Sequence, residues 1–412
     1  MLPEDGVTGG DGGLPDEWCL RHFDHLSDEL AQALPETMGR MRRLCPVARS
    51  EEHGGFWVVS SYDEALAVAQ DWATYSSAHG LSITASPGVV RNLPVEADPP
   101  QQYIFKRLVN PFFTPSAVAR WEPRTRDLVN ELIDGFTGAG RGQRRAEFMD
   151  AFARPLPSRA FFELAVNAPA QDLAKVSALA STSSTPNDPR ARECWLGLHQ
   201  WVRDFIAQRR GQPPRGDVVD AVIAADIDGR PITDDEIVGT VQLLILGGLE
   251  TTAGALGLAM VRLCRDHELQ RALRGNPRLI PAAVEESLRL DPSFVSVGRT
   301  AVADAELAGH AIARGDKVLI HWASANRDGG EFPGPDRFDL ARERNRHLAF
   351  GAGPHRCVGS SLARMNLRIA LEELLRRLDD ITLDTGPEPA TRYHAGLTRS
   401  PLSVPIRFTP LR

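Results

Sequence analysis

Apolar residues recur every three to four positions along most of the chain, which is the spacing of one face of an α-helix. The spacing predicts long helices at 62–70, 115–136, 190–210, 233–266, 279–290 and 360–378. The alternating pattern of strands is confined to shorter stretches, at 55–60, at 300–322 and at 380–408. We therefore expect a mainly α fold with small β-sheets.

The helix predicted at 233–266 is the longest, and its middle breaks the apolar pattern. Gly247 and Gly248 each cost about 1 kcal/mol relative to alanine inside a helix. They are followed by Glu250, a carboxylate among leucines, which is costly unless it is paired or used in chemistry. Close helix packing would explain the glycines but leaves Glu250 unexplained.

A turn-rich stretch, FGAGPHRCVG (350–359), precedes the last long helix. Gly351 and Gly353 allow a tight turn, and Gly359 leaves room for another surface. Cys357 lies just before a helix N-terminus, where free backbone N–H groups and the helix dipole favour a thiolate. A thiolate beside room for a flat group suits the axial ligand of an iron porphyrin. The alternative, a buried inert thiol, is what we expect of the other four cysteines.

Composition excludes several classes of protein. The 412 residues carry a formal net charge of -7 at pH 7, which does not favour nucleic-acid binding. Five scattered cysteines without a CxxC pair indicate a reducing compartment and argue against a tetrahedral zinc site. The longest apolar run, VQLLILGGL, is too short to span a membrane, so we expect a cytoplasmic protein. Residues 1–13 are expected to be flexible, and residues 14–412 to form a single domain.

Six motifs resemble those of the cytochrome P450 family, and their order and spacing match that family over nearly the whole chain. FGAGPHRCVG matches the haem-binding signature F-G-x-G-x-H-x-C-x-G at every fixed position, and GGLETT (247–252) matches the oxygen-activating helix motif. Two further stretches resemble helical segments of the family: DPPQQYIFKRL (98–108) the helix over the haem edge, and EESLR (285–289) the helix with the Glu-x-x-Arg pair. SVGRTA (296–301) resembles the segment whose arginine binds a haem propionate, and FPGPDRFDLAR (332–342) resembles the irregular segment called the meander. The likeness is greatest to the soluble bacterial class that includes the camphor hydroxylase.

The resemblance implies a cytochrome P450 fold, one triangular-prism-like domain, and a haem b whose iron is bound by Cys357. Many bacterial relatives carry His and Arg in the helix over the haem edge, where this chain has Gln102 and Lys106. Glutamine still donates one bond, and lysine supplies charge without a bidentate fork. The further cofactor contacts that the resemblance implies are Phe350, Gly351, Gly359, His355, Arg299, Gln102, Lys106, Gly247 and Gly248.

The resemblance also assigns catalytic, structural and substrate-binding roles. Thr251 is expected to contact dioxygen, and Glu250 to deliver protons through water. Glu286 and Arg289 would form a buried structural pair that Arg337 joins. The expected substrate wall consists of Leu243, Leu244, Gly247, Phe294, Val295 and Val297.

The function implied is that of a haem-thiolate monooxygenase that inserts one atom of O2 into a small apolar or natural-product-like molecule. Two electrons would come from NAD(P)H through a separate reductase and ferredoxin, since no reductase domain is expected in the chain. We expect a monomer that binds neither nucleic acid nor membrane, with a basic docking face made by Lys106, Arg107, Arg344, Arg346, Arg356 and Arg364. The alternatives are a peroxide-driven or non-hydroxylating member of the family, and a haem sensor without catalysis.

Overall fold

The computed structural model describes residues 20–84, 90–138, 142–185, 187–384, 393 and 396–411. The segment expected to be flexible, 1–13, and Cys19 lie outside these residues. The α-helices are α2 (Asp28–Gln32), α3 (Leu34–Leu44), α4 (Tyr62–Gln70), α5 (Gln101–Val109), α6 (Pro115–Ala119), α7 (Glu122–Thr137), α8 (Pro155–Ala160), α9 (Leu173–Ser183), α10 (Ala191–Arg210), α11 (Val218–Ile223), α12 (Asp234–Arg265), α13 (His267–Gly275), α14 (Ile280–Leu290), α15 (Trp322–Ala325) and α16 (Ser360–Arg377).

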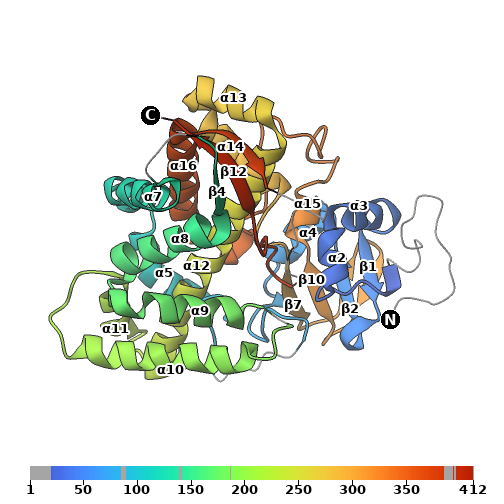
Figure 1. The fold of residues 1–412 in the computed structure, drawn as a ribbon. Coiled ribbons are helices and arrows are strands. Elements are labelled where there is room, and N and C mark those ends of the chain that lie inside the picture. Colours follow the sequence, from blue (N-terminus) through green and yellow to red (C-terminus); the bar gives the residue numbers. More distant parts are fainter. Residues whose placement is uncertain are drawn as a thin grey trace.

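The largest sheet lies to one side of the main group of helices, whereas β4 and β12 of the second sheet lie near α14 and α16 (Figure 1). The largest sheet has the order β1-β2-β10-β7-β3, in which β10 runs parallel to β2 and the other pairs are antiparallel. The second has the order β11-β12-β4, and β5-β6 and β8-β9 are hairpins. The strands are β1 (Val47–Ser50), β2 (Phe56–Val59), β3 (Tyr75–Ser76), β4 (Arg144–Glu147), β5 (Asp226–Ile227), β6 (Arg230–Pro231), β7 (Val297–Ala301), β8 (Ala305–Leu307), β9 (His310–Ile312), β10 (Lys317–Ile320), β11 (Leu378–Leu383) and β12 (Pro405–Pro410). The expectation of a mainly α fold with small sheets is confirmed.

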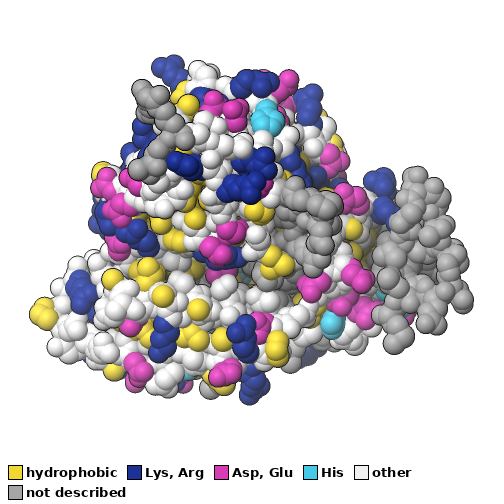
Figure 2. All heavy atoms as spheres, in the orientation of Figure 1, with side chains coloured by type: hydrophobic (Ala, Val, Ile, Leu, Met, Phe, Trp, Pro, Cys, Tyr) yellow, Lys and Arg dark blue, Asp and Glu magenta, His cyan; other side chains and the backbone are white. Residues whose placement is uncertain are grey.

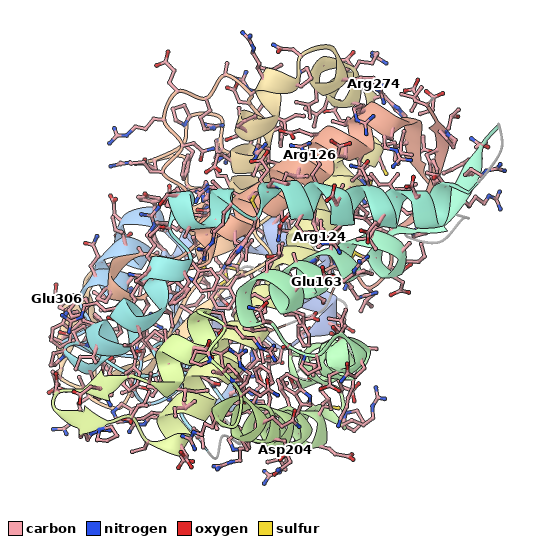
Figure 3. All side chains as sticks on the ribbon, turned by 90° about the vertical axis from the view of Figure 1, so that its left-hand side faces the viewer. Arg124, Arg126, Glu163, Asp204, Arg274 and Glu306 are labelled. Atoms are coloured by element: carbon pink, nitrogen blue, oxygen red, sulfur yellow. The ribbon has the colours of Figure 1, made fainter. Side chains whose placement is uncertain are left out.

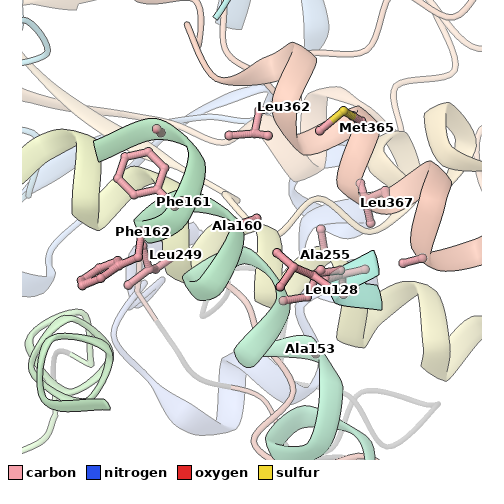
Figure 4. Close-up of a cluster of buried hydrophobic side chains, with 14 of the residues drawn as sticks. Leu128, Ala153, Ala160, Phe161, Phe162, Leu249, Ala255, Leu362, Met365 and Leu367 are labelled. Carbon is pink, nitrogen blue, oxygen red and sulfur yellow. The ribbon is translucent and has the colours of Figure 1, made fainter. Parts of the chain in front are cut away.

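Helix α12 is the centre of the helical part. It starts at a capping box in which Thr233 and Glu236 bond each other's backbone N–H groups. By length and apolar composition it could cross a membrane, but 72% of its most apolar window is buried inside the protein. It is therefore a core helix, and it packs against α8, α10 and α16. Figure 4 shows part of this core, with Phe161, Phe162 and Leu249 on one side and residues of α16 on the other.

Ion pairs fasten α7 to its neighbours, as Figure 3 shows. Arg126 of α7 bonds Glu372 and Glu373 of α16, and Arg124 bonds Glu163 in the turn after α8. On the face shown in Figure 2, Lys and Arg side chains lie beside Asp and Glu side chains at several places. The pairs that Arg126 forms with Glu372 and Glu373 fasten α16, the helix that follows the cysteine stretch, to α7.

Two of the sequence predictions need adjustment. The helix expected at 115–136 is divided into α6 and α7, because Pro123 cannot donate the backbone hydrogen bond that would continue the first helix. The strand region at 300–322 yields β7 to β10 and then turns into α15 at Trp322. The other five long helices lie within three residues of the predicted bounds.

Candidate active site

The cysteine stretch forms a tight loop that is fastened to α4 and ends at the start of α16. The N–H of Cys357 donates to the Phe350 carbonyl over 2.9 Å, which closes the loop. Gly351 and Gly353 have φ of 67° and 64°, the left-handed region that glycine tolerates. A Cβ on Gly353 would lie 2.3 Å from the Ala69 carbonyl oxygen, so this close approach to α4 also requires glycine.

Cys357 stands just before α16, as predicted: it is three residues before Ser360, the first residue of the helix, and two before the N-cap Gly359. Its side chain is accessible at an open depression. The surrounding protein raises the pKa of the thiol by desolvation, whereas the Gly359 N–H, Lys106 and Arg364 oppose that rise. The expected preference for thiolate is therefore only partly met by the protein, and a bound metal ion would complete it, since coordination deprotonates a thiol.

Arg299 and His355 lie close to each other, and each has hydrogen-bonding capacity that the described residues do not use. Arg299 on β7 is 3% exposed, and the hydrogen bond found for its guanidinium within the described residues goes to the Gly298 carbonyl. His355 bonds Ser77 through Nε2 over 3.1 Å, while its buried Nδ1 has no partner among the described residues. Burial, and then Arg299, lower the pKa of His355 to about 3. A buried cation beside an orphaned ring nitrogen fits the carboxylates of an anionic cofactor, and with Cys357 this donor set fits haem.

Gln102 and Lys106, on α5, bind the cysteine loop itself. Gln102 Nε2 and Lys106 Nζ both donate to the Pro354 carbonyl, over 2.7 and 2.6 Å, and Lys106 also donates to the Arg356 carbonyl. The Gln102 Oε1 atom is buried and has no hydrogen-bond partner in the described part of the chain. Both residues therefore brace the loop beneath Cys357, and their contact with a propionate stays a prediction.

The two mid-helix glycines of α12 serve different purposes. Gly247 is exposed, and a Cβ there would meet no atom of the described residues within 4 Å, so these residues leave open space beside the helix at this point. A Cβ on Gly248 would lie 2.8 Å from the Phe161 ring, so this glycine admits a phenylalanine rather than oxygen or substrate. Thr251 borders the open side, and its Oγ1 donates to the Gly247 carbonyl over 2.8 Å. Close helix packing therefore explains Gly248, and the cofactor contact that the resemblance implies for it stays a prediction.

Glu250 lies one residue before Thr251 and is largely enclosed. Desolvation raises the pKa of its carboxyl, and the opposing influences are the charge of Arg154 and a hydrogen bond from the Ser181 hydroxyl. Arg154 is itself occupied by Asp150 and by the Leu402 carbonyl. A carboxyl in this position can hold a proton at higher pH than an ordinary glutamate and release it towards the Gly247 opening.

The expected substrate wall is only partly accessible. Leu243, Gly247 and Phe294 have exposed surface, whereas the other three side chains are packed in the hydrophobic clusters. These are Leu244, Val295 and Val297, exposed by 8%, 4% and 4%. A substrate would reach them only after neighbouring side chains move, so their role as wall residues is not supported by the structure.

The buried structural pair is present, but its third member differs from the prediction. Glu286 and Arg289 form two bonds of 2.9 Å, and both are at most 1% exposed. Arg337 contributes only its backbone carbonyl to Arg289, and its exposed side chain pairs with Asp339. Arg342 takes the position predicted for Arg337, since its Nε lies 2.8 Å from Glu286. The five-residue error arose because both arginines stand in the same irregular segment.

Phe350 is held over the loop by charged groups that the motif did not reveal. The Arg364 guanidinium lies 4.5 Å from the Phe350 ring centroid. Arg364 is fixed by two bonds to Glu285, which also bonds His347. Phe350 is thus kept close to Cys357, consistent with the shielding role expected for it.

Sequence reasoning missed several residues that the structure brings to the site. Ser181 stands in a serine- and threonine-rich stretch at the end of α9, and Phe161 follows the short helix α8. Neither has a local signal, because each is defined by what it meets on α12. Ser77 beside His355 is likewise visible only through the fold.

Comparison with known proteins identifies the arrangement. The family model described as Cytochrome P450 matches residues 159–406. The cytochrome P450 monooxygenase PikC of Streptomyces venezuelae is 32% identical over 394 residues, 93% of each chain. The mycinamicin IV hydroxylase/epoxidase of Micromonospora griseorubida is 33% identical, over 89% of this chain and 94% of that one. The structure of a mutant of P450 EryK in complex with erythromycin B covers 92% of this chain and 97% of its own at a TM-score of 0.82 and 31% identity.

Proposed function

Because the chain belongs to the cytochrome P450 family and is a haem-thiolate monooxygenase, we propose that it oxidises a largely apolar natural product with electrons from a separate ferredoxin. The observation that supports this most directly is the open space beside Gly247, bordered by Thr251 and Glu250. Glu250, the proposed proton donor, is next to Thr251 in the sequence and three residues after Gly247.

The haem, when bound through Cys357, supplies the iron chemistry that activates O2 and transfers one oxygen atom. The residues of the chain anchor it and control protons and water. Arg299 and His355 would bind the propionates, and Phe350 would shield one side of the thiolate. The Thr251 hydroxyl donates to the Gly247 carbonyl, so its lone pairs are free to accept a hydrogen bond from water. We propose that this water carries protons from Glu250.

Two features support the proposed substrate class. The accessible wall residues Leu243 and Phe294 are apolar, and an apolar wall favours an apolar ligand. Relatives carry names that include mycinamicin IV, and a solved relative holds erythromycin B. We therefore propose a bulky natural product, as in secondary metabolism, and the reaction would be a hydroxylation or an epoxidation.

The electron donor is proposed to dock over Cys357. The depression there, of about 980 Å³, has four cationic side chains on its lining and two carboxylates. An acidic ferredoxin would match this excess of positive charge. A ferredoxin reductase using NAD(P)H would complete the supply. We further propose a cytoplasmic monomer, because the four described cysteines are all free.

The test is a screen of natural products that follows the ferric haem spectrum, then turnover of the best ligand with NAD(P)H, reductase and ferredoxin under 18O2. We expect one labelled oxygen in the product. Thr251→Ala should keep ligand binding and lower product formation by at least about tenfold while NAD(P)H is still consumed. Equal turnover of the wild type and this variant with hydrogen peroxide alone would favour the peroxide-driven alternative. Failure of every ligand to promote electron uptake would favour the sensor.

A further inference from the structure

A cluster of histidines lies where the chain before α2 meets the turn between β1 and β2. Asp24 and His25 come from the first segment, and His53 from the 3₁₀ turn η1 (Glu52–Gly54). His53 Nε2 lies 2.7 Å from Asp24 Oδ1, and the rings of His25 and His53 are 5.4 Å apart at 81°. One ligand atom from each of the three lies within 4.8 Å of the other two.

His25 is the unusual member of the cluster. It is 6% exposed, and neither ring nitrogen has a hydrogen-bond partner within the described residues. Buried polar atoms are nearly always satisfied, so two orphaned nitrogens on one ring call for a ligand. Burial, and then the neighbouring His53, lower the pKa of His25 to about 4. Its imidazole is therefore neutral at pH 7, with a lone pair available for coordination.

A small cavity on the inner side of His25 offers a partner for one nitrogen. It has a volume of about 20 Å³ and is lined by His25, Ser296 and His321, among others. The Ser296 hydroxyl is also buried, and no described residue forms a hydrogen bond with it. The volume suffices for one water molecule, which would bond one His25 nitrogen and Ser296. The second nitrogen is then left for the group that contains Asp24 and His53.

We propose that Asp24, His25 and His53 bind one divalent transition-metal ion, with zinc as the best match. Two imidazoles and one carboxylate are a ligand set typical of such ions, and water would complete the shell. The ion would replace the proton between His53 and Asp24. The lack of CxxC pairs in the chain does not bear on this site, because its ligands include no cysteine.

The bound ion would link segments of the chain that are far apart in the sequence. His25 also accepts a bond from the Gly396 N–H over 2.9 Å through its carbonyl, so three distant parts of the chain meet here. His53 adopts φ of 50°, which is uncommon for a residue other than glycine. In this conformation its side chain bonds Asp24. Bound metal would hold the segment before α2 on the edge of the large sheet. The proposal is independent of the monooxygenase function.

The experiment uses the haem-loaded protein without an affinity tag, freed of loose metal by a chelator. ZnCl2 is titrated in competition with a chromophoric chelator, and thermal unfolding is followed with and without zinc. We expect one zinc ion per chain, bound with a dissociation constant on the order of 1 μM or below, and a higher Tm with zinc. His53→Ala and Asp24→Asn should each weaken binding at least about tenfold and abolish the Tm shift.

Two controls keep the result specific. His267→Ala removes an exposed histidine at the start of α13 and should bind zinc as the wild type does. His22→Ala removes the neighbouring His22–Glu52 pair, whose atoms lie 3.2 Å apart. The absence of zinc binding by the wild type, or equal binding by His53→Ala, would overturn the proposal. Loss of binding in His22→Ala alone would also overturn it. The reduced carbon monoxide spectrum should be unchanged in every variant, which shows that each is folded and haem-loaded.

Discussion

Glu250 shows how the environment of a single residue adjusts proton supply. Desolvation raises the pKa of its carboxyl, while the Arg154 charge and the Ser181 hydroxyl oppose the rise. Ser181→Ala removes a bond that favours the charged form, so the pKa should rise further. Because the protonated form donates, the alkaline limb of the kcat–pH profile should then move to higher pH. Glu250→Gln should remove that limb and lower kcat about 100-fold. In Ser183→Ala, whose hydroxyl bonds the Ala180 carbonyl, the profile should stay unchanged.

The two arginines of the meander provide a second test at the level of residues. Arg342→Ala leaves the buried Glu286 carboxylate short of one charge partner, and we expect a loss of about 3 kcal/mol in the free energy of unfolding. Arg337→Ala removes an exposed pair with Asp339 and should change it by less than about 0.5 kcal/mol. Urea unfolding of the haem-loaded variants, followed by tryptophan fluorescence, measures both. The reverse order of the two losses would contradict the assignment of Arg342.

At the scale of elements, His321 couples the stability of α15 to pH. It is 1% exposed, and its Nδ1 accepts the Ser324 N–H at the start of the helix, which requires a neutral ring. Burial, and then Arg42, lower its pKa to about 3. Below pH 6.5 His321 becomes protonated in the unfolded chain, whereas in the folded protein it stays neutral down to about pH 3. Stability should therefore fall with pH, by about 2 to 3 kcal/mol at His321 between pH 6.5 and 4.5.

The variant His321→Asn keeps an acceptor at this cap and removes the titration. Its unfolding free energy, measured in urea at several pH values, should fall less steeply below pH 6.5 than that of the wild type. A contribution from His25 remains in both proteins and cancels in the comparison. Parallel curves for the two proteins would show that His321 does not cause the acid sensitivity.

The elements also show what the sequence could and could not predict. Helices such as α4 and α12 were found because apolar spacing and, for α12, the capping signal at Thr233 are local properties. Cys357 and its loop were found because turn chemistry and a helix start are local too. The roles of Gly248 and Ser181 were not, since these depend on Phe161 and Glu250, which other elements supply. The roles of such residues are set by tertiary contacts, and the spacing of apolar residues along the sequence does not indicate which contacts form.

For the whole molecule, the distribution of charge decides how electrons arrive. The net charge of -7 is unfavourable for an acidic partner at long range, yet the depression over Cys357 is locally positive. Several cations predicted for this face are occupied: Arg346 is paired with Glu331, and Arg364 with Glu285. Arg356 is exposed on the lining and is the best probe of docking. The cations of the lining are Lys106, Arg356, Arg364 and Arg368.

Arg356→Glu reverses one of these charges without removing a packing contact of Phe350. We expect electron transfer from an acidic ferredoxin to slow by about tenfold at low ionic strength. The difference from the wild type should shrink as salt is added, because the Debye length falls to about 10 Å at 0.1 M. Arg314→Glu, an exposed change in the turn before β10, should have little effect, and chemical reduction by dithionite should be equal in all three proteins. Stopped-flow reduction of the haem measures the rates, and an unchanged salt dependence in Arg356→Glu would exclude docking at this depression.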